Sequence, residues 1–115
     1  MTTVYGLPQC DTCRKARAWL DAAGVAYRFV DYRATPLPAA DLQRFAAQLG
    51  WEKLVNRAST TWRQLSDERK SPATDADWLV LVGEFPALIR RPLLVREGGT
   101  AMVGFSADRY AEAFQ

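Results

Sequence analysis

The chain contains no histidine and only two cysteines, so several kinds of site are hard to build from it. A protein zinc site normally takes four ligands from cysteine, histidine or carboxylate groups. Cys10 and Cys13 could supply half of such a set, but no histidine or third cysteine completes it. We therefore expect no metal ion bound within one copy of the chain.

Long apolar runs and a strong charge of either sign are also missing. No run approaches the length of a membrane span, and the N-terminus lacks the charged start and apolar core of a secretory signal. Fifteen basic and thirteen acidic residues leave a net charge of +2, too small to indicate nucleic-acid binding by charge alone. We expect a cytoplasmic protein whose cysteines are normally reduced, with no membrane partner and no direct nucleic-acid partner.

The segment Cys10–Cys13 stands between a short apolar run, Val4–Pro8, and a helix-like stretch, Arg14–Ala23. This order places a thiol at a helix N-terminus, where backbone N–H groups and the helix dipole stabilise a thiolate. A thiolate at neutral pH is a nucleophile. Two inert core thiols are the alternative, and it is stronger for Cys13, which also falls on the apolar stripe of the helix. We predict that Cys10 is the nucleophile and Cys13 the candidate resolving thiol.

The first third of the chain predicts a strand, a helix and a second strand. Residues 2–7 are typical of a buried strand, and Gly24 is a natural end for the helix that follows the cysteines. Residues 25–32 alternate in strand fashion and are rich in aromatic and β-branched side chains. Strand, helix and strand within about thirty residues indicate a βαβ unit, with parallel strands joined by a right-handed crossover.

The middle of the chain changes to helical patterns. The predicted helices cover residues 38–49, 51–55, 61–65 and 77–82. The last of these is a short apolar run that also fits a strand. We favour a helix, because Asp75 and Asp77 suit a first turn and Gly83 suits a C-terminus.

The last third predicts a hairpin and a closing helix. Leu93–Arg96 and Thr100–Gly104 flank a glycine turn, and Ser106 is a good N-cap for the final helix. The element order is βαβ, a helical insert, then ββα. We predict one α/β domain over residues 1–115, with a core of residues 1–35 and 86–115 and a helical insertion of about 36–85.

Two separated segments of this chain resemble the ArsC/Spx family of thioredoxin-like proteins. Cys10–Leu20 is similar to the family's catalytic segment, and Ala87–Val95 resembles its arginine–proline segment. Asn56–Arg63 and Met102–Phe105 look most like the YffB-type proteobacterial branch. The resemblance implies a thioredoxin-like four-stranded mixed sheet with an inserted helical bundle. It also implies a cis peptide at Arg91-Pro92 that faces the first cysteine.

The same resemblance implies chemistry for the site. In the family's arsenate reductases the counterpart of Cys10 attacks arsenate, glutathione attacks the adduct, and three arginines hold the oxyanion. Arg91 matches the middle arginine. The first falls at Asn56, with Arg57 one place later, and the third falls at Gly104, which carries no charge. Charged contacts to an anion contribute about 1.5–3 kcal/mol each, so we expect this chain to bind arsenate more weakly.

A further departure lies at Gly6, where the family has a histidine just before the nucleophile. The predicted substrate-binding residues are Thr12, Arg57, Arg91 and Pro92. The N–H groups of Thr12 and Cys13 would stabilise a thiolate. A guanidinium binds anions through paired planar donors and stays charged, so Arg91 would hold an oxyanion or a carboxylate of glutathione.

Three functions follow as hypotheses. The first is a glutathione-linked thiol reductase of YffB type, acting on a mixed disulfide or a small oxidised or anionic substrate. The second is an arsenate reductase that uses glutathione and glutaredoxin, which Gly104 disfavours. The third is a Spx-like redox-sensing regulator that binds RNA polymerase and uses the cysteine pair as a switch. In each case we expect no bound cofactor; glutathione would be a co-substrate.

Overall fold

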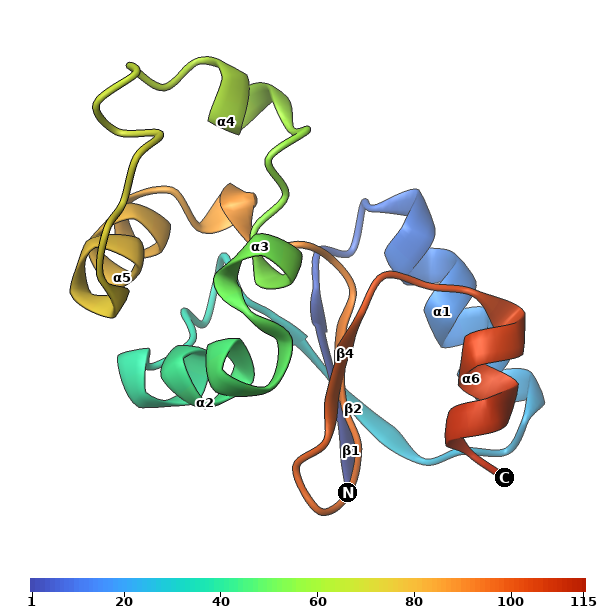
Figure 1. The fold of residues 1–115 in the computed structure, drawn as a ribbon. Coiled ribbons are helices and arrows are strands. Elements are labelled where there is room, and N and C mark those ends of the chain that lie inside the picture. The colour runs from blue at the N-terminus through green and yellow to red at the C-terminus, as the bar shows by residue number, and fades with distance from the viewer. The chain divides into compact units, whose positions relative to one another are not determined.

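The computed structural model describes all 115 residues (Figure 1). The elements in chain order are β1 (Thr2–Gly6), α1 (Asp11–Ala22), β2 (Tyr27–Asp31), α2 (Ala39–Leu49), α3 (Trp51–Leu54), α4 (Thr60–Arg63), α5 (Asp75–Glu84), the 3-10 turn η1 (Pro86–Leu88), β3 (Leu93–Val95), β4 (Ala101–Val103) and α6 (Ala107–Ala113). They form two compact units, residues 1–35 with 91–115, and residues 36–90. That both units make up a single domain, with an insertion of about 36–85, stays a prediction. None of the helices has the length and apolar character needed to cross a membrane.

The first unit contains a four-stranded sheet in the order β2-β1-β3-β4. β1 runs parallel to β2 and antiparallel to β3, and β3 pairs with β4 in an antiparallel hairpin. α1 and α6 lie on the same side of this sheet in Figure 1. Val4 and Leu94 from the sheet pack there against Leu20 of α1 and Tyr110 of α6. The predicted α/β fold with a mixed sheet is confirmed.

Local features of the sequence explain which face of α1 is buried and where the helix ends. Cys13, Ala16 and Leu20 follow one another at helical spacing and are fully buried, so one stripe of the helix faces the sheet. Gly24 follows the helix with a φ of +72°, a left-handed conformation that glycine adopts without steric cost. The predicted end of the helix is therefore confirmed.

The hairpin and the closing helix also follow from local chemistry. Gly98 and Gly99 both have a φ of +96° and form the turn between β3 and β4. The hydroxyl of Ser106 accepts a hydrogen bond from the N–H of Arg109 at 3.3 Å, which confirms it as the N-cap of α6.

The second unit is helical and is built around aromatic stacking. The rings of Trp51 and Trp78 stack with centroids 5.7 Å apart, and Trp62 stacks on Trp78 at 5.9 Å. The helix expected over residues 77–82 is confirmed as α5, but the prediction that Gly83 ends it was wrong. Gly83 lies inside α5, which continues to Glu84, because the helix ends only as the chain approaches Pro86.

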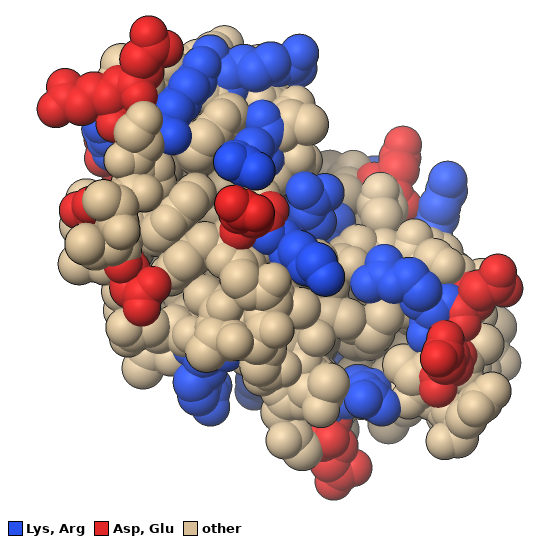
Figure 2. Space-filling view, viewed as in Figure 1, with Lys and Arg blue, Asp and Glu red and all other residues tan.

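The surface of the molecule carries both signs of charge. Basic and acidic side chains are interspersed with uncharged atoms on the face shown in Figure 2. This distribution agrees with a net charge of only +2.

Candidate active site

Cys10 lies at the junction between the loop after β1 and the first turn of α1. It is the N-cap residue of α1, with an extended backbone conformation. Its N–H donates to the carbonyl of Leu7 at 3.1 Å, and its carbonyl accepts the N–H of Arg14 at 3.0 Å. These two bonds fix the backbone of Cys10 on both sides, and the residue is half-buried, so solvent can still reach it.

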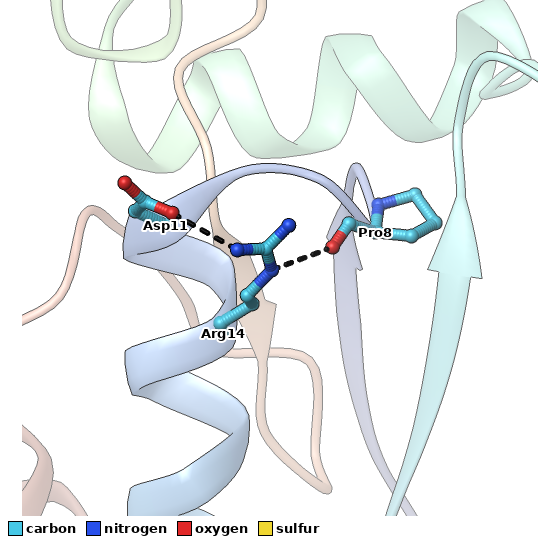
Figure 3. Close-up of polar contacts among 3 residues, drawn as sticks. All are labelled: Pro8, Asp11 and Arg14. Atoms are coloured by element: carbon cyan, nitrogen blue, oxygen red, sulfur yellow. Dashed lines mark hydrogen bonds and ion pairs between the residues drawn. The ribbon is translucent and has the colours of Figure 1, made fainter.

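The side chain of Arg14 joins the first turn of α1 to the loop before it (Figure 3). Its Nε donates to the carbonyl of Pro8 at 3.3 Å, and its Nη1 lies 3.2 Å from Oδ1 of Asp11. Both charged groups are exposed, so this ion pair adds little to stability. It does place a positive charge beside Asp11, a carboxylate that follows Cys10 directly and by itself opposes a negative charge on the neighbouring sulfur.

The surroundings of Cys10 favour its thiolate form. Burial by itself raises the pKa of this thiol, but polar groups around the sulfur outweigh that effect. The N–H of Cys13, the thiol of Cys13, the guanidinium of Arg91 and the N–H of Thr12 each favour a charged sulfur, and together they hold the pKa below its ordinary value. The sequence-based expectation that the N–H groups of Thr12 and Cys13 face Cys10 agrees with this arrangement.

Cys13 has the opposite character. It is completely buried, and burial raises the pKa of its thiol to about 11, with the nearby sulfur of Cys10 adding to that rise. The N–H of Leu7 contributes in the other direction. At neutral pH Cys13 is therefore a thiol whose proton faces Cys10, and the two cysteines form an asymmetric pair.

Gly6, at the end of β1, provides the space that Cys13 occupies. A β-carbon built on Gly6 would lie 2.5 Å from Sγ of Cys13, closer than real contacts permit. Only a residue without a side chain lets the buried sulfur approach the strand this closely. The sequence shows the glycine, but its relationship to Cys13 needs the fold.

Arg91 is far from the two cysteines in the sequence but lies beside Cys10 in the fold. It is half-buried, precedes β3, and forms a cis peptide bond with the fully buried Pro92, as the family resemblance implied. Its guanidinium is a hydrogen-bond partner of the Cys10 sulfur, and Nη1 also donates to the phenol oxygen of Tyr32 at 3.0 Å. Tyr32 was not among the predicted site residues. A hint was available, because it follows β2 at the edge where the parallel strands β1 and β2 both end.

The remaining predicted residue, Arg57, belongs to the second unit. It is exposed in the segment between α3 and α4, where Asn56 closes a turn by accepting the N–H of Ala58 at 3.0 Å. Its assignment to substrate binding stays a prediction. Gly104, which aligns with the family's third arginine, has a φ of +76°, a conformation that an arginine rarely adopts. No three cysteine, aspartate or glutamate side chains gather where they could hold a metal ion.

Comparison with known proteins identifies the family. The ArsC family model matches residues 5–113, which is nearly the whole chain. This chain belongs to the ArsC family. The resemblance seen in the two sequence segments is thereby confirmed, together with the thioredoxin-like fold that the family implied.

Three relatives show how far the likeness to other ArsC family members extends. A solved structure of a YFFB protein is 41% identical, with a TM-score of 0.92, and the match covers all of both chains. An arsenate reductase (ArsC) related protein from Brucella melitensis is 40% identical, with a TM-score of 0.75 over 99% of this chain and 94% of that one. The global transcriptional regulator Spx of Enterococcus faecalis is 33% identical over 94% of this chain and 82% of its own length. The family thus contains both reductase-related proteins and regulators.

Proposed function

We propose that this ArsC family protein is a glutathione-linked thiol reductase with Cys10 as its nucleophile. The observation that carries the proposal is the set of donors around the Cys10 sulfur: two backbone N–H groups, a buried thiol and a guanidinium. Each stabilises negative charge on sulfur, so a larger share of Cys10 is thiolate at a given pH than in an ordinary cysteine. A buried structural cysteine has no need of such surroundings.

The reaction is a pair of thiol–disulfide exchanges. The Cys10 thiolate attacks the glutathione sulfur of a mixed disulfide, forms a Cys10–glutathione disulfide and releases the substrate as a thiolate, which takes a proton from solvent. A glutathione thiolate then attacks the glutathione sulfur of that adduct. Oxidised glutathione leaves and the Cys10 thiolate returns, so each turnover oxidises the sulfur of the incoming glutathione and reduces the substrate sulfur, while the glutathione sulfur of the mixed disulfide stays at the disulfide level.

Arg91 provides the anion-binding group of the site. Its guanidinium already faces the Cys10 sulfur, and it stays charged at every relevant pH. It would bind a carboxylate of the glutathione part and hold the disulfide beside Cys10. Thr12, in the first turn after Cys10, and Pro92, next to Arg91, would shape the substrate position, and Arg57 remains a candidate for a further anion contact.

Cys13 acts first as a hydrogen-bond donor. Its thiol faces Cys10 and has a pKa of about 11, so very little of it is a thiolate at neutral pH. Because thiolates rather than thiols attack disulfides, glutathione in solution would resolve the adduct faster than Cys13 does.

The test is a coupled assay with glutathione, glutathione reductase and NADPH. The first substrate is the mixed disulfide of cysteine and glutathione, the second is arsenate with glutaredoxin present, and Cys10→Ser is the control for both. Turnover of the disulfide alone supports the proposal. Turnover of arsenate alone would replace it with arsenate reduction, despite the glycine at position 104. No turnover of either substrate would overturn both enzymatic functions.

One finding favours a second candidate, a redox-sensing regulator: the 33% identity with a protein described as a global transcriptional regulator. In this role Cys10 and Cys13 would switch between dithiol and disulfide and change the affinity for RNA polymerase. A pull-down with RNA polymerase under reducing and oxidising conditions separates it from the enzymes. A stable complex that depends on the redox state would favour the regulator.

A further inference from the structure

The phenol oxygen of Tyr32 accepts a hydrogen bond from Nη1 of Arg91 at 3.0 Å, although 59 positions separate the two residues. Arg91 is also a hydrogen-bond partner of the Cys10 sulfur. Tyr32 therefore lies on one side of the guanidinium and Cys10 on another. We propose that Tyr32 is a positioning residue that holds Arg91 in the orientation that serves Cys10. The proposal rests on Cys10 being the reactive thiol of the function proposed above.

The backbone fixes Tyr32 tightly. Its N–H donates to the carbonyl of Gly6 at 3.3 Å, which extends the pairing of β2 with β1 by one residue. The carboxylate of Asp31, the residue before Tyr32, accepts hydrogen bonds from the N–H groups of Arg33 and Ala34, at 2.9 and 3.3 Å. These bonds stabilise the turn that follows β2. The Tyr32 side chain is 1% exposed, so it is a rigid anchor.

An arginine without such an anchor would be less well placed. The side chain is long, carries much rotamer freedom, and loses it only when its planar fork is held by partners. Arg91 is half-buried beside a site open to solvent, so it could turn outward when no anion is bound. A neutral acceptor on Nη1 fixes the fork without cancelling its charge. Burial raises the pKa of Tyr32, so the phenol stays neutral.

A purely structural reading assigns the roles the other way round, with Arg91 serving only to satisfy a buried hydroxyl. The two readings differ in what happens at Cys10. If Tyr32 positions Arg91, removal of the phenol oxygen weakens the stabilisation of the Cys10 thiolate. If Arg91 only satisfies Tyr32, the same change leaves the reactivity of Cys10 as it was.

The test measures the rate at which iodoacetamide alkylates Cys10 across pH 5–10, with mass spectrometry to distinguish Cys10 from Cys13. In Tyr32→Phe we expect alkylation at pH 7 to be about threefold to tenfold slower, with the midpoint of the pH profile moved upward. Arg91→Ala should show at least that loss. The double variant should match Arg91→Ala within about twofold, since a residue that acts only through another adds nothing once that residue is gone.

Tyr27→Phe is the matched control. The Tyr27 hydroxyl also accepts from an arginine, Nε of Arg17 at 3.3 Å, but it lies at the opposite end of β2, paired with Thr2. It should leave the alkylation profile unchanged. A wild-type profile in Tyr32→Phe, or losses that multiply in the double variant, would overturn the proposal.

Arg91→Lys tests the same idea with Tyr32 in place, should Tyr32→Phe fail to fold. A lysine keeps the positive charge but loses the planar fork that spans Tyr32 and Cys10. We expect its alkylation rate to fall clearly below wild type, and a wild-type rate would contradict the need for a positioned guanidinium. The assay needs no turnover, so loss of reductase activity with an intact alkylation pattern would reject the enzyme function and not the role of Tyr32.

Discussion

Sγ of Cys13 occupies the space that a side chain on Gly6 would need, with only 2.5 Å between the sulfur and the point where a β-carbon would lie. The two residues are complementary: with Sγ of Cys13 placed as it is here, any side chain at position 6 would force the sulfur or the strand to move. The family's histidine at this position could not coexist with Cys13 as it is placed here. The departure at Gly6 is therefore tied to the presence of the second cysteine.

Gly6→Ala should destabilise the protein by about 1–3 kcal/mol, because the new methyl group forces Cys13 or the strand to move. Urea unfolding under reducing conditions measures the free energy. The same substitution in a Cys13→Ala background should cost much less, because the sulfur is gone. Gly83→Ala is the control, since a β-carbon there meets nothing within 4 Å inside α5, and it should be neutral or stabilising. Equal costs of Gly6→Ala in both backgrounds would show that the clash is not with Cys13.

Cys13 should make the folded state less stable at high pH. Its pKa is raised from 9.0 in the unfolded chain to about 11 in the folded one, so its contribution is fully present below pH 9 and is lost as the pH rises to about 11. The difference between these values sets an upper limit of about 3 kcal/mol. Unfolding free energies at pH 8 and pH 11 should differ more in wild type than in Cys13→Ser, which has no group to titrate there. Equal differences would mean that Cys13 ionises as readily in the folded protein as in the unfolded chain.

Loss of each thiol should have a different effect on turnover. Cys10→Ser should abolish thiol chemistry, because the other thiol at the site, Cys13, is buried and has a pKa of about 11. Cys13→Ser should keep glutathione-dependent turnover largely intact, since glutathione resolves the adduct. Steady-state rates with the cysteine–glutathione mixed disulfide decide the matter, and equal loss in both variants would instead indicate an obligatory internal disulfide.

Arg91→Ala should raise KM for an anionic substrate by about tenfold or more, because a charge-assisted contact of roughly 1.5–3 kcal/mol is removed. The effect on folding stability, through the buried Tyr32 hydroxyl that loses this partner, should be smaller than the effect on KM. Arg96→Ala is a matched control, because Arg96 is also half-buried but donates to the carbonyl of Ala113. It should affect stability rather than KM. Unchanged kinetics in Arg91→Ala would remove Arg91 from the site.

Much of the fold could be predicted because its signals are local. Gly24 and Ser106 mark the ends of α1 and α6 through backbone conformation and side-chain capping, which depend on neighbours within a few residues. The end of α5 was predicted wrongly because two local signals compete there. Glycine is common at helix ends, but the helix continues past Gly83 and ends only near Pro86.

The candidate nucleophile, Cys10, could be predicted from the sequence alone, because a thiol directly before a helix lies close to the first backbone N–H groups of that helix. The sequence also determined the family, through two separated segments. The fold was needed to find that Arg91 interacts with both Tyr32 and Cys10, and that Sγ of Cys13 lies where a side chain on Gly6 would be. These relationships join residues far apart in the chain, and they exist only once β1 lies between β2 and β3 with α1 packed against the sheet.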